Sequence, residues 1–257
     1  MDFSGKTALV TGAAGAIGKG VAAGFLKGGA RVFITDLDPG AVEAAVRELG
    51  GGCFGRAADV TKEPQVAETV AAAAKALDGR IDILVNVAGI VGQGKVEDLT
   101  EADWDRMFAV NCKGTFLFAK HAVPLMKARR YGRIVNYSSK SGKTGSALMS
   151  HYSAAKAAVI GFTQALAYEL ADSGITVNCL CPGITDNTGV WSHVSAGYIQ
   201  NLNLPREEVV RKFTEKIPLK RLARIEDLVA VTLFLASSGA DYMTGQAINV
   251  TGGREMH

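Results

Sequence analysis

Two residues able to move a proton stand four positions apart in the stretch 137–159. Tyr152 and Lys156 lie among alanines and other small residues, which predicts the start of a helix, so both side chains would project from one helical face. A free phenol titrates at about pH 10, and an opposite charge within reach favours its ionised form. The spacing therefore indicates a phenol whose pKa is lowered by the Lys156 ammonium toward the range where general acid–base catalysis is effective.

A hydroxyl group follows the strand predicted upstream of that helix. The apolar run 133–137 is typical of a buried strand, and Ser139 comes at its carboxyl end, where a parallel sheet presents ligand-binding groups. The Ser139 hydroxyl is able to hold a carbonyl oxygen. A Tyr and a Lys four apart are most often exposed surface residues, so the pair gains weight only from motifs elsewhere in the chain.

A glycine-rich turn stands near the start of the chain. Residues 7–10 predict a short strand, and TGAAGAIG at 11–18 predicts the turn that opens a helix to about Lys27. The unpaired amides at such a helix N-terminus bind phosphates, and Gly12 and Gly18 let a pyrophosphate approach the main chain closely. The turn therefore indicates a dinucleotide site.

Asp36 ends the second predicted strand, 31–35, near the place where an acidic side chain meets the adenosine ribose of a dinucleotide. A carboxylate there accepts hydrogen bonds from both ribose hydroxyls and repels a 2′-phosphate. No Lys or Arg follows in residues 37–40, so NAD is favoured over NADP. The alternative is that Asp36 only forms a turn before Pro39.

Taken together, the glycine-rich turn and the set Ser139, Tyr152 and Lys156 resemble the short-chain dehydrogenase/reductase family over nearly the whole chain. The resemblance implies that Tyr152 gives or takes the proton, that Ser139 polarises the substrate carbonyl and that Lys156 also holds the nicotinamide ribose. Asn111 interrupts a helical pattern and has two interpretations. It satisfies backbone groups at a kink or, like the matching Asn of the family, holds a water that connects Lys156 to solvent, which is the interpretation we favour.

The resemblance also implies the other contacts with the cofactor. The family usually has a glycine where this chain has Ala16, with Gly15 one place earlier, and a second Asn where this chain has Val87. The implied cofactor contacts are Gly12, Gly15, Ala16, Ile17, Gly18, Asp36, Asp59, Val60, Asn86, Ala88, Gly89, Tyr152, Lys156, Pro182, Gly183 and Thr185.

Strands and helices alternate between these motifs. Further strands are expected at 53–58, 83–85, 176–180 and 247–250, and helices at 41–49, 63–77, 101–110, 115–127, 154–171 and 224–236. This order predicts one doubly wound Rossmann domain of the α/β class over residues 1–257, with a parallel sheet of about seven strands and helices on both faces.

The segment 184–217 is polar and irregular, with a charged helical piece at 206–215, and we expect it to form a substrate lid. Thr185 and Thr188 are candidate contacts with the nicotinamide carboxamide. Trp191 is expected to anchor the lid, and His193 is either a substrate ligand or, as we favour, a surface residue. His151 is expected to face away from the site, since one helical step turns it about 100° from Tyr152.

Composition excludes several classes of protein. The net charge is +3 with both signs interspersed, so we expect no nucleic-acid partner. The four cysteines lack zinc spacing, and we expect reduced thiols and no metal. No leader or membrane-spanning run is evident, which predicts a cytoplasmic protein with no membrane partner. The family resemblance implies a homotetramer with helices 113–130 and 151–171 at one interface.

The predicted function is an NAD-dependent oxidoreductase that transfers a hydride between a secondary alcohol or ketone and the nicotinamide. The polar lid, and the likeness of the second half to polyol dehydrogenases of the family, favour a polyol or sugar as the small-molecule substrate. One alternative is a 3-oxoacyl thioester reductase whose patch of Lys127, Arg129 and Arg130 receives an acidic carrier protein. Another is a dinucleotide-sensing protein without catalysis, against which the intact Ser139, Tyr152 and Lys156 argue.

Overall fold

Short apolar runs form the seven strands of one parallel sheet, in the order β3-β2-β1-β4-β5-β6-β7. The computed structural model describes residues 1–189, 191 and 205–257. The strands are Thr7–Thr11 (β1), Arg31–Asp36 (β2), Cys53–Ala57 (β3), Ile83–Asn86 (β4), Gly132–Tyr137 (β5), Ile175–Pro182 (β6) and Ala247–Val250 (β7). The predicted doubly wound α/β fold, with about seven parallel strands, is confirmed.

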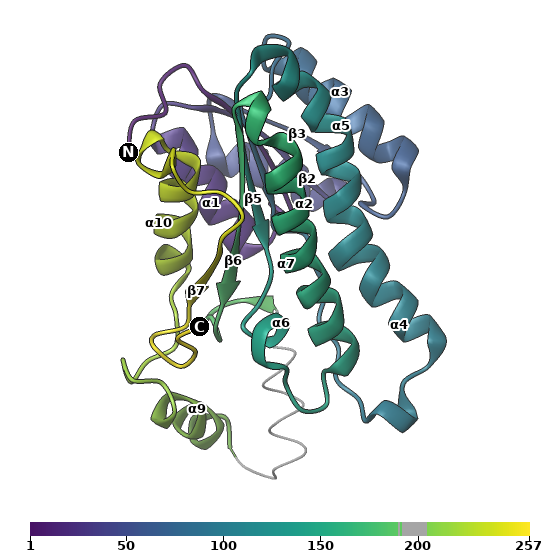
Figure 1. Ribbon diagram of the computed structural model, residues 1–257, viewed down its shortest axis with the longest axis vertical. Helices are drawn as coiled ribbons and strands as arrows, with labels where there is room; N and C mark the ends of the chain where they lie inside the picture. The colour runs from purple at the N-terminus through teal and green to yellow at the C-terminus, as the bar shows by residue number, and fades with distance from the viewer. Residues whose placement is uncertain (190, 192–204) are drawn as a thin grey trace.

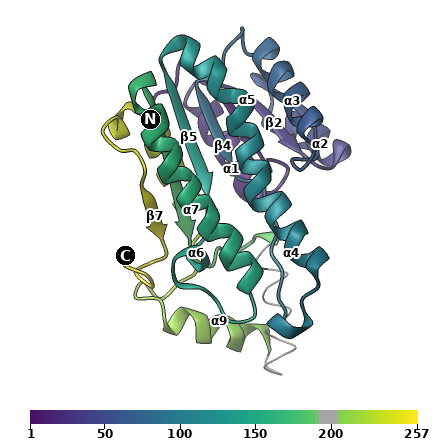
Figure 2. The ribbon, with the colours of Figure 1, turned by 45° about the vertical axis from the view of Figure 1, so that its right-hand side comes forward.

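Helices cover both faces of the sheet (Figures 1 and 2). One core cluster joins the sheet to α1 (Ala16–Lys27), α2 (Pro39–Leu49) and α10 (Ile225–Ala236). A second cluster joins the other face to α3 (Glu63–Ala76), α5 (Gly114–Arg129) and α7 (Ser150–Leu170). A π-helix, Ala109–Lys113, links α4 (Glu101–Phe108) to α5. Strands buried on both faces explain the apolar runs that made them recognisable in the sequence.

The remaining short helices gather at the carboxyl ends of the last strands (Figure 1). They are α6 (Ser141–Thr144), directly after β5, and α9 (Arg206–Glu215), within the predicted lid. Short 3-10 turns elsewhere cover Val96–Asp98, Ala171–Ser173 and Ser238–Ala240. No described helix is long and apolar enough to span a bilayer.

The order of the strands reverses at β1, whose neighbours in the sheet are β2 and β4. Ligands of open α/β sheets bind in the crevice outside the carboxyl ends of strands at such a switch point. Here the exits of β1 and β4 are joined directly, since the Thr11 hydroxyl oxygen accepts hydrogen bonds from the amides of Val87 and Ala88, both at 3.1 Å. Thr11 therefore fixes the turn after β4 against the glycine-rich turn.

The start of one helix and the presence of a short helix differ from the sequence prediction. Helix α7 begins at Ser150 rather than at Ala154, so His151 and Tyr152 belong to its first turn. Met149 occupies the N-cap without a side-chain hydrogen bond, so the usual start signal of a capping Ser, Thr, Asp or Asn is missing. The four-residue helix α6 was not predicted, because so short an element has no periodicity to read.

Candidate active site

Two hollows meet at the carboxyl edge of the sheet. The first, called the groove, has a volume of about 930 Å³ and follows the ends of β1, β2 and β4. The second, called the cavity, has a volume of about 630 Å³ and lies beside the ends of β5 and β6. Ile17, Val87 and Gly89 line both. The hollows are thus neighbouring parts of one cleft.

The glycine-rich turn forms one end of the groove. A Cβ atom on Gly18 would lie 2.4 Å from the carbonyl oxygen of Gly12, so the turn and the helix can pack this closely only with glycine. Gly15, the N-cap of α1, has no side chain that could bond to the first amides of the helix, and no acidic residue occupies the first turn. The helix amides are therefore free to bind an anion. All five predicted residues of the turn line the groove: Gly12, Gly15, Ala16, Ile17 and Gly18.

Asp36 lies at the end of β2 on the groove wall. One of its carboxylate oxygens accepts a hydrogen bond from the amide of Ala14 at 2.9 Å, and the other accepts one from the amide of Leu37 at 2.7 Å. The carboxylate is thereby held between the glycine-rich turn and the exit of β2. Asp59 and Val60, expected near the adenine, line the same groove.

The other predicted cofactor contacts divide between the hollows. Ala88 lines the groove, Gly89 lines both hollows, and Pro182, Gly183 and Thr185 line the cavity. Asn86 lines neither hollow. It is the last residue of β4, where its buried side-chain amide donates to the Asn136 side-chain oxygen at 2.9 Å, so its predicted backbone contact with the cofactor stays a prediction. The close glycine packing, the open helix amides and the carboxylate at the far end together fit a dinucleotide.

Tyr152 and Ser139 line the cavity and are both buried. Burial raises the pKa of the Tyr152 phenol, and a hydrogen bond with the Ser139 side chain acts in the opposite direction. The sequence led us to expect a lowered pKa. The direction is reversed because removal of the phenol from solvent disfavours the phenolate more than neighbouring groups favour it.

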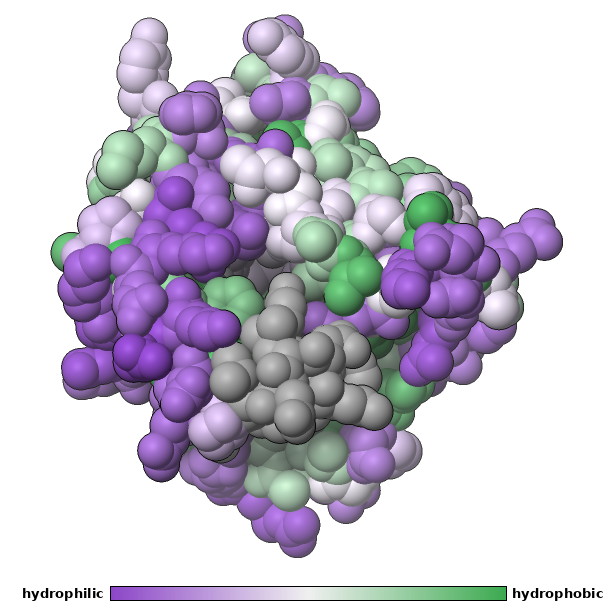
Figure 3. Space-filling view, turned by 90° about the horizontal axis from the view of Figure 1, so that it is seen from below, coloured by the Kyte–Doolittle hydropathy of each residue, from purple (hydrophilic) through white to green (hydrophobic). Residues whose placement is uncertain are grey.

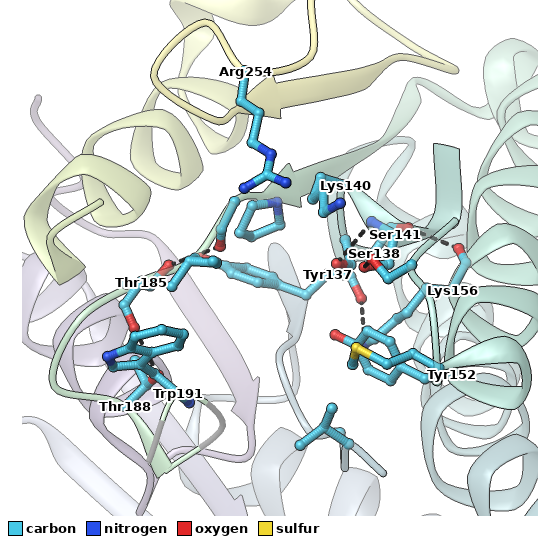
Figure 4. Close-up of a pocket in the computed structure, with 18 of the residues that line it drawn as sticks. Tyr137, Ser138, Lys140, Ser141, Tyr152, Lys156, Thr185, Thr188, Trp191 and Arg254 are labelled. Atoms are coloured by element: carbon cyan, nitrogen blue, oxygen red, sulfur yellow. Dashed lines mark hydrogen bonds between the residues drawn. The ribbon is translucent and has the colours of Figure 1, made fainter. Parts of the chain in front are cut away.

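Lys156 is also buried on the cavity wall (Figure 4). Its ammonium donates a hydrogen bond to the Tyr137 carbonyl oxygen at 2.8 Å and lies 5.9 Å from the centre of the Tyr152 ring. Burial lowers the pKa of Lys156 to about 8, with smaller opposing effects from Cys179, Cys181 and Cys112. The hydroxyl of Ser138 donates to the Lys156 carbonyl oxygen at 2.7 Å, which ties α7 to the end of β5.

Asn111 is fully buried in the π-helix and lines the cavity. Its side-chain nitrogen donates to the carbonyl oxygens of Ile90 and Met107, and its side-chain oxygen accepts from the amide of Ile90. These bonds satisfy backbone groups where the helix departs from α geometry, as the first interpretation of Asn111 required. A Cβ on Gly89 would lie 2.6 Å from the Asn111 side-chain oxygen and 3.2 Å from the Lys156 nitrogen, so both side chains flank this glycine.

Comparison with known proteins decides the family. The family model described as enoyl-(acyl carrier protein) reductase matches residues 12–255. The chain belongs to the short-chain dehydrogenase/reductase family. The sorbitol dehydrogenase of Cereibacter sphaeroides is 39% identical over 259 residues, covering 100% of both chains. The galactitol 2-dehydrogenase of Agrobacterium fabrum is 36% identical, again over 100% of both chains. A crystal structure of a variant actinorhodin polyketide ketoreductase with NADPH superposes with a TM-score of 0.94 at 35% identity, covering 98% of each chain.

The segment 184–217, predicted to form a lid, is partly described. Trp191 is 2% exposed and packs edge-to-face on Phe213 of α9, with ring centres 5.7 Å apart, in keeping with its expected anchoring role. Thr185 and Thr188 line the cavity, on the opposite side from Tyr152 (Figure 4). The prediction for His193 falls outside the described residues.

His151 does not lie where the sequence predicted. It is buried and lines the groove, and its ring packs on Gly92, where a Cβ would come within 2.8 Å of the ring. Burial lowers the pKa of His151, and the Asp103 carboxylate opposes this effect. His151 is one residue from Tyr152 on α7, so its side chain points about 100° away, toward the groove rather than the cavity.

The sequence analysis did not identify the cations that line the cavity in addition to Lys156, which are Lys140, Lys212, Lys216 and Arg254. They come from the exit of β5, from α9 and its end, and from the segment after β7. The family resemblance says nothing of them, and they share no spacing that could have revealed a common site. Within the described part of the chain, no three His, Cys, Asp or Glu side chains are grouped as metal ligands.

Proposed function

We propose that this family member is an NAD-dependent oxidoreductase that interconverts a secondary alcohol and a ketone on a polyol or sugar. The observation that carries the proposal is the pair of buried hydroxyls, Ser139 and Tyr152, in a cavity that opens into a dinucleotide groove. A sensor of dinucleotides needs the groove but has no use for a buried phenol beside a buried ammonium.

The residues of the cavity divide the work on the substrate. The bound nicotinamide supplies the hydride acceptor or donor. Ser139 holds the substrate oxygen by hydrogen bonding, and the Tyr152 hydroxyl exchanges a proton with that oxygen. A raised pKa keeps the phenol protonated, which is the form that donates to a ketone oxygen. In the direction of alcohol oxidation, Tyr152 accepts the proton of the alcohol. It must then be in its phenolate form, which the Lys156 ammonium stabilises.

Asn111 is a positioning residue in this mechanism. Its side-chain nitrogen holds the carbonyl oxygens of Ile90 and Met107, and its side-chain oxygen flanks Gly89 together with the Lys156 nitrogen, so the proposed proton route from Lys156 to solvent passes this point. The remaining cofactor contacts stay those predicted above, with Asn86 acting from within β4.

Asp36 supports NAD as the preferred cofactor. Its carboxylate is fixed on the groove wall, the next residue is Leu37, and no cation occupies the following three positions. A 2′-phosphate at this place would meet a negative charge without a basic partner.

The likeness to sorbitol and galactitol dehydrogenases supports a polyol substrate. The likeness to a polyketide ketoreductase keeps a 3-oxoacyl thioester as the second candidate. The patch that would receive a carrier protein lies at the far end of the molecule, however, because Lys127, Arg129 and Arg130 end α5 and precede β5, whose opposite end carries Ser139. A carrier docked on this patch would not face the cavity.

A homotetramer is the proposed assembly. Helices α5 and α7 lie side by side on one face of the molecule (Figure 2) and expose Phe116 and Tyr168, the latter by 89%. Apolar and aromatic residues exposed together suit a subunit interface. Light scattering in solution gives the particle mass that tests this assembly.

The decisive experiment is the initial rate of cofactor reduction with NAD and with NADP across polyols, sugars and 3-hydroxyacyl thioesters. We expect turnover of a polyol with NAD, and a loss of about 10²- to 10⁴-fold in kcat for Tyr152→Phe, since this variant removes the proton donor while keeping the ring. Tyr242→Phe, at a fully exposed tyrosine outside α5 and α7, is the matched control. Full activity of the Tyr152→Phe protein would refute the mechanism.

A further inference from the structure

The cavity is positively charged. Apart from Lys156, which the mechanism uses, its described lining includes Lys140, Lys212, Lys216 and Arg254 and contains no Asp or Glu. Lys212 and Lys216 are four residues apart, so they stand on one face at the exposed end of α9. Seen from this end of the molecule, hydrophilic residues crowd the side on which Figure 1 shows α9 (Figure 3). The mouth of the cavity therefore attracts anions.

Of these cations, Arg254 is the one with a buried nitrogen that lacks a partner among the described residues. Its guanidinium reaches toward the cavity from the segment after β7, with Lys140 close by (Figure 4). Its Nη1 atom is buried and has no hydrogen-bond partner among the described residues, although 21% of the side chain is exposed. A buried guanidinium nitrogen without an acceptor is costly, so an acceptor is expected to come from a ligand.

One carboxylate, that of Glu255, is shared by two cations. Its Oε1 atom lies 3.4 Å from Nε of Arg254 and 3.7 Å from Nζ of Lys140. The three groups together keep a net positive charge. Burial lowers the pKa of Lys140, and Glu255 opposes this effect. Glu255 thus orients the Arg254 fork through Nε and leaves Nη1 for another acceptor.

The chain holds Arg254 in place through a tight turn. Gly252 and Gly253 both have positive φ angles, 66° and 89°, and a Cβ on Gly252 would lie 2.7 Å from Ile217. The Gly252 carbonyl oxygen accepts a hydrogen bond from the Leu219 amide at 3.1 Å, so the turn is attached to the segment that follows α9. The guanidinium also lies 5.8 Å from the centre of the Phe213 ring. Arg254 is therefore positioned by both the C-terminal turn and the lid.

We propose that the substrate carries a phosphate or carboxylate group, which Arg254 binds while Ser139 and Tyr152 act on a hydroxyl or ketone elsewhere in the same molecule. This inference rests on the proposed function and narrows its substrate to an anionic hydroxy compound. The anion is not the pyrophosphate of the cofactor, because Arg254 lines the cavity and the glycine-rich turn lines the groove. Arginine suits the role, since its planar fork binds either group through two parallel hydrogen bonds.

The test compares three six-carbon ligands, sorbitol, sorbitol 6-phosphate and gluconate, by calorimetry at constant ionic strength with NADH saturating the protein. NADH occupies the glycine-rich turn and so prevents the ligands from binding there. We expect at least one anion to bind about 10- to 100-fold more tightly than sorbitol, the range of a charged hydrogen-bonded pair. The ligand that gains affinity distinguishes a phosphate site from a carboxylate site.

Arg254→Gln should remove that advantage and leave the affinity for sorbitol within about threefold, whereas Arg254→Lys should restore part of it. Arg211→Gln is the matched control, because Arg211 is exposed on α9, does not line the cavity and pairs with Glu215. Equal affinities for all three ligands, or an equal loss for all three in Arg254→Gln, would overturn the inference.

Turnover measured in parallel separates this inference from the proposed function. Oxidation of sorbitol without any preference for the anions would support the proposed oxidoreductase activity and refute the anion site. Tight Arg254-dependent binding of an anion with no turnover of any compound keeps the anion site and removes the proposed reaction. Thermal unfolding of Arg254→Gln and Arg254→Lys checks that both variants are folded.

Discussion

The groove and the cavity are neighbours, yet they are constructed by different means. The groove is made largely by the main chain: tight glycine turns, the open amides of α1 and one carboxylate that two backbone amides fix. The cavity is made by side chains from separated parts of the chain, which include the segment after β4, the π-helix, β5 and α6, α7, the exit of β6, the predicted lid with α9, and the segment after β7. The main chain therefore shapes the site proposed for the dinucleotide, whereas converging side chains shape the site proposed for the substrate.

The largest expected effect within this comparison comes from the glycine-rich turn. Gly18→Ala places a Cβ atom 2.4 Å from the Gly12 carbonyl oxygen, where only backbone atoms are available to move. We expect NADH to bind about 100-fold more weakly in a fluorescence titration, because displacement of the turn removes the amides that bind the pyrophosphate.

The matched control for this change is Gly40→Ala. Gly40 is exposed in the first turn of α2, and the nearest atom to its Cβ would be a side-chain oxygen of Asp38 at 3.3 Å. NADH affinity should stay within about twofold of the unmodified protein, since nothing in the groove moves. If Gly18→Ala bound NADH equally well, the groove would depend on side chains after all, and the contrast with the cavity would be lost.

The same contrast explains which parts of the molecule could be predicted from sequence. The strands, most helices, the glycine-rich turn and the position of Asp36 were predictable because apolar runs, glycines and short spacings encode them locally. The set Ser139, Tyr152 and Lys156 was recognisable for the same reason, since the three residues lie within one short stretch, 139–156. Arg254 could not be found, because it reaches the cavity only through the pairing of β7 with β6 and the turn at Gly252 and Gly253.

The environment of a residue was likewise not predictable. Sequence spacing brought Tyr152 and Lys156 onto one helical face, but it contained no information on how far each would be removed from solvent. Burial proved to be the largest influence on both pKa values. The start of α7 had no local signal either, because Met149 at its N-cap makes no side-chain hydrogen bond.

Lys156 lies where the cavity meets the groove, and its burial has a measurable cost. Its pKa falls from 10.5 to about 8, so between these values the unfolded chain binds more protons than the folded one. The free energy of unfolding therefore rises with pH between about 8 and 10.5. Below pH 8 it is reduced by the full cost of burying the ammonium. Relative to Lys156→Met, the protein should gain roughly 2 kcal/mol in free energy of unfolding between pH 7 and pH 10.

Urea unfolding at fixed pH values measures this difference, and taking it against Lys156→Met removes the contribution of every other titrating group. Lys113→Met, one residue before the start of α5, is the control and should show no such pH dependence relative to the unmodified protein. A flat difference for Lys156 would mean that the ammonium is as well stabilised in the cavity as in water. The cavity would then resemble the part of the groove where main-chain amides satisfy the Asp36 carboxylate.

The smallest effect is expected at Asp36, the one side chain on which the groove depends for its choice of cofactor. Asp36→Ala removes the ribose acceptor and the charge that repels a 2′-phosphate, so the ratio of NAD to NADP affinity should fall about 10-fold. Asp38→Ala is the matched control: this exposed carboxylate caps α2 by accepting a hydrogen bond from the Ala41 amide, so its loss lowers stability by about 1 kcal/mol without changing the ratio. If Asp36→Ala weakened NAD and NADP equally, its carboxylate would serve only to hold the amides of Ala14 and Leu37, and cofactor choice would have to come from elsewhere in the groove.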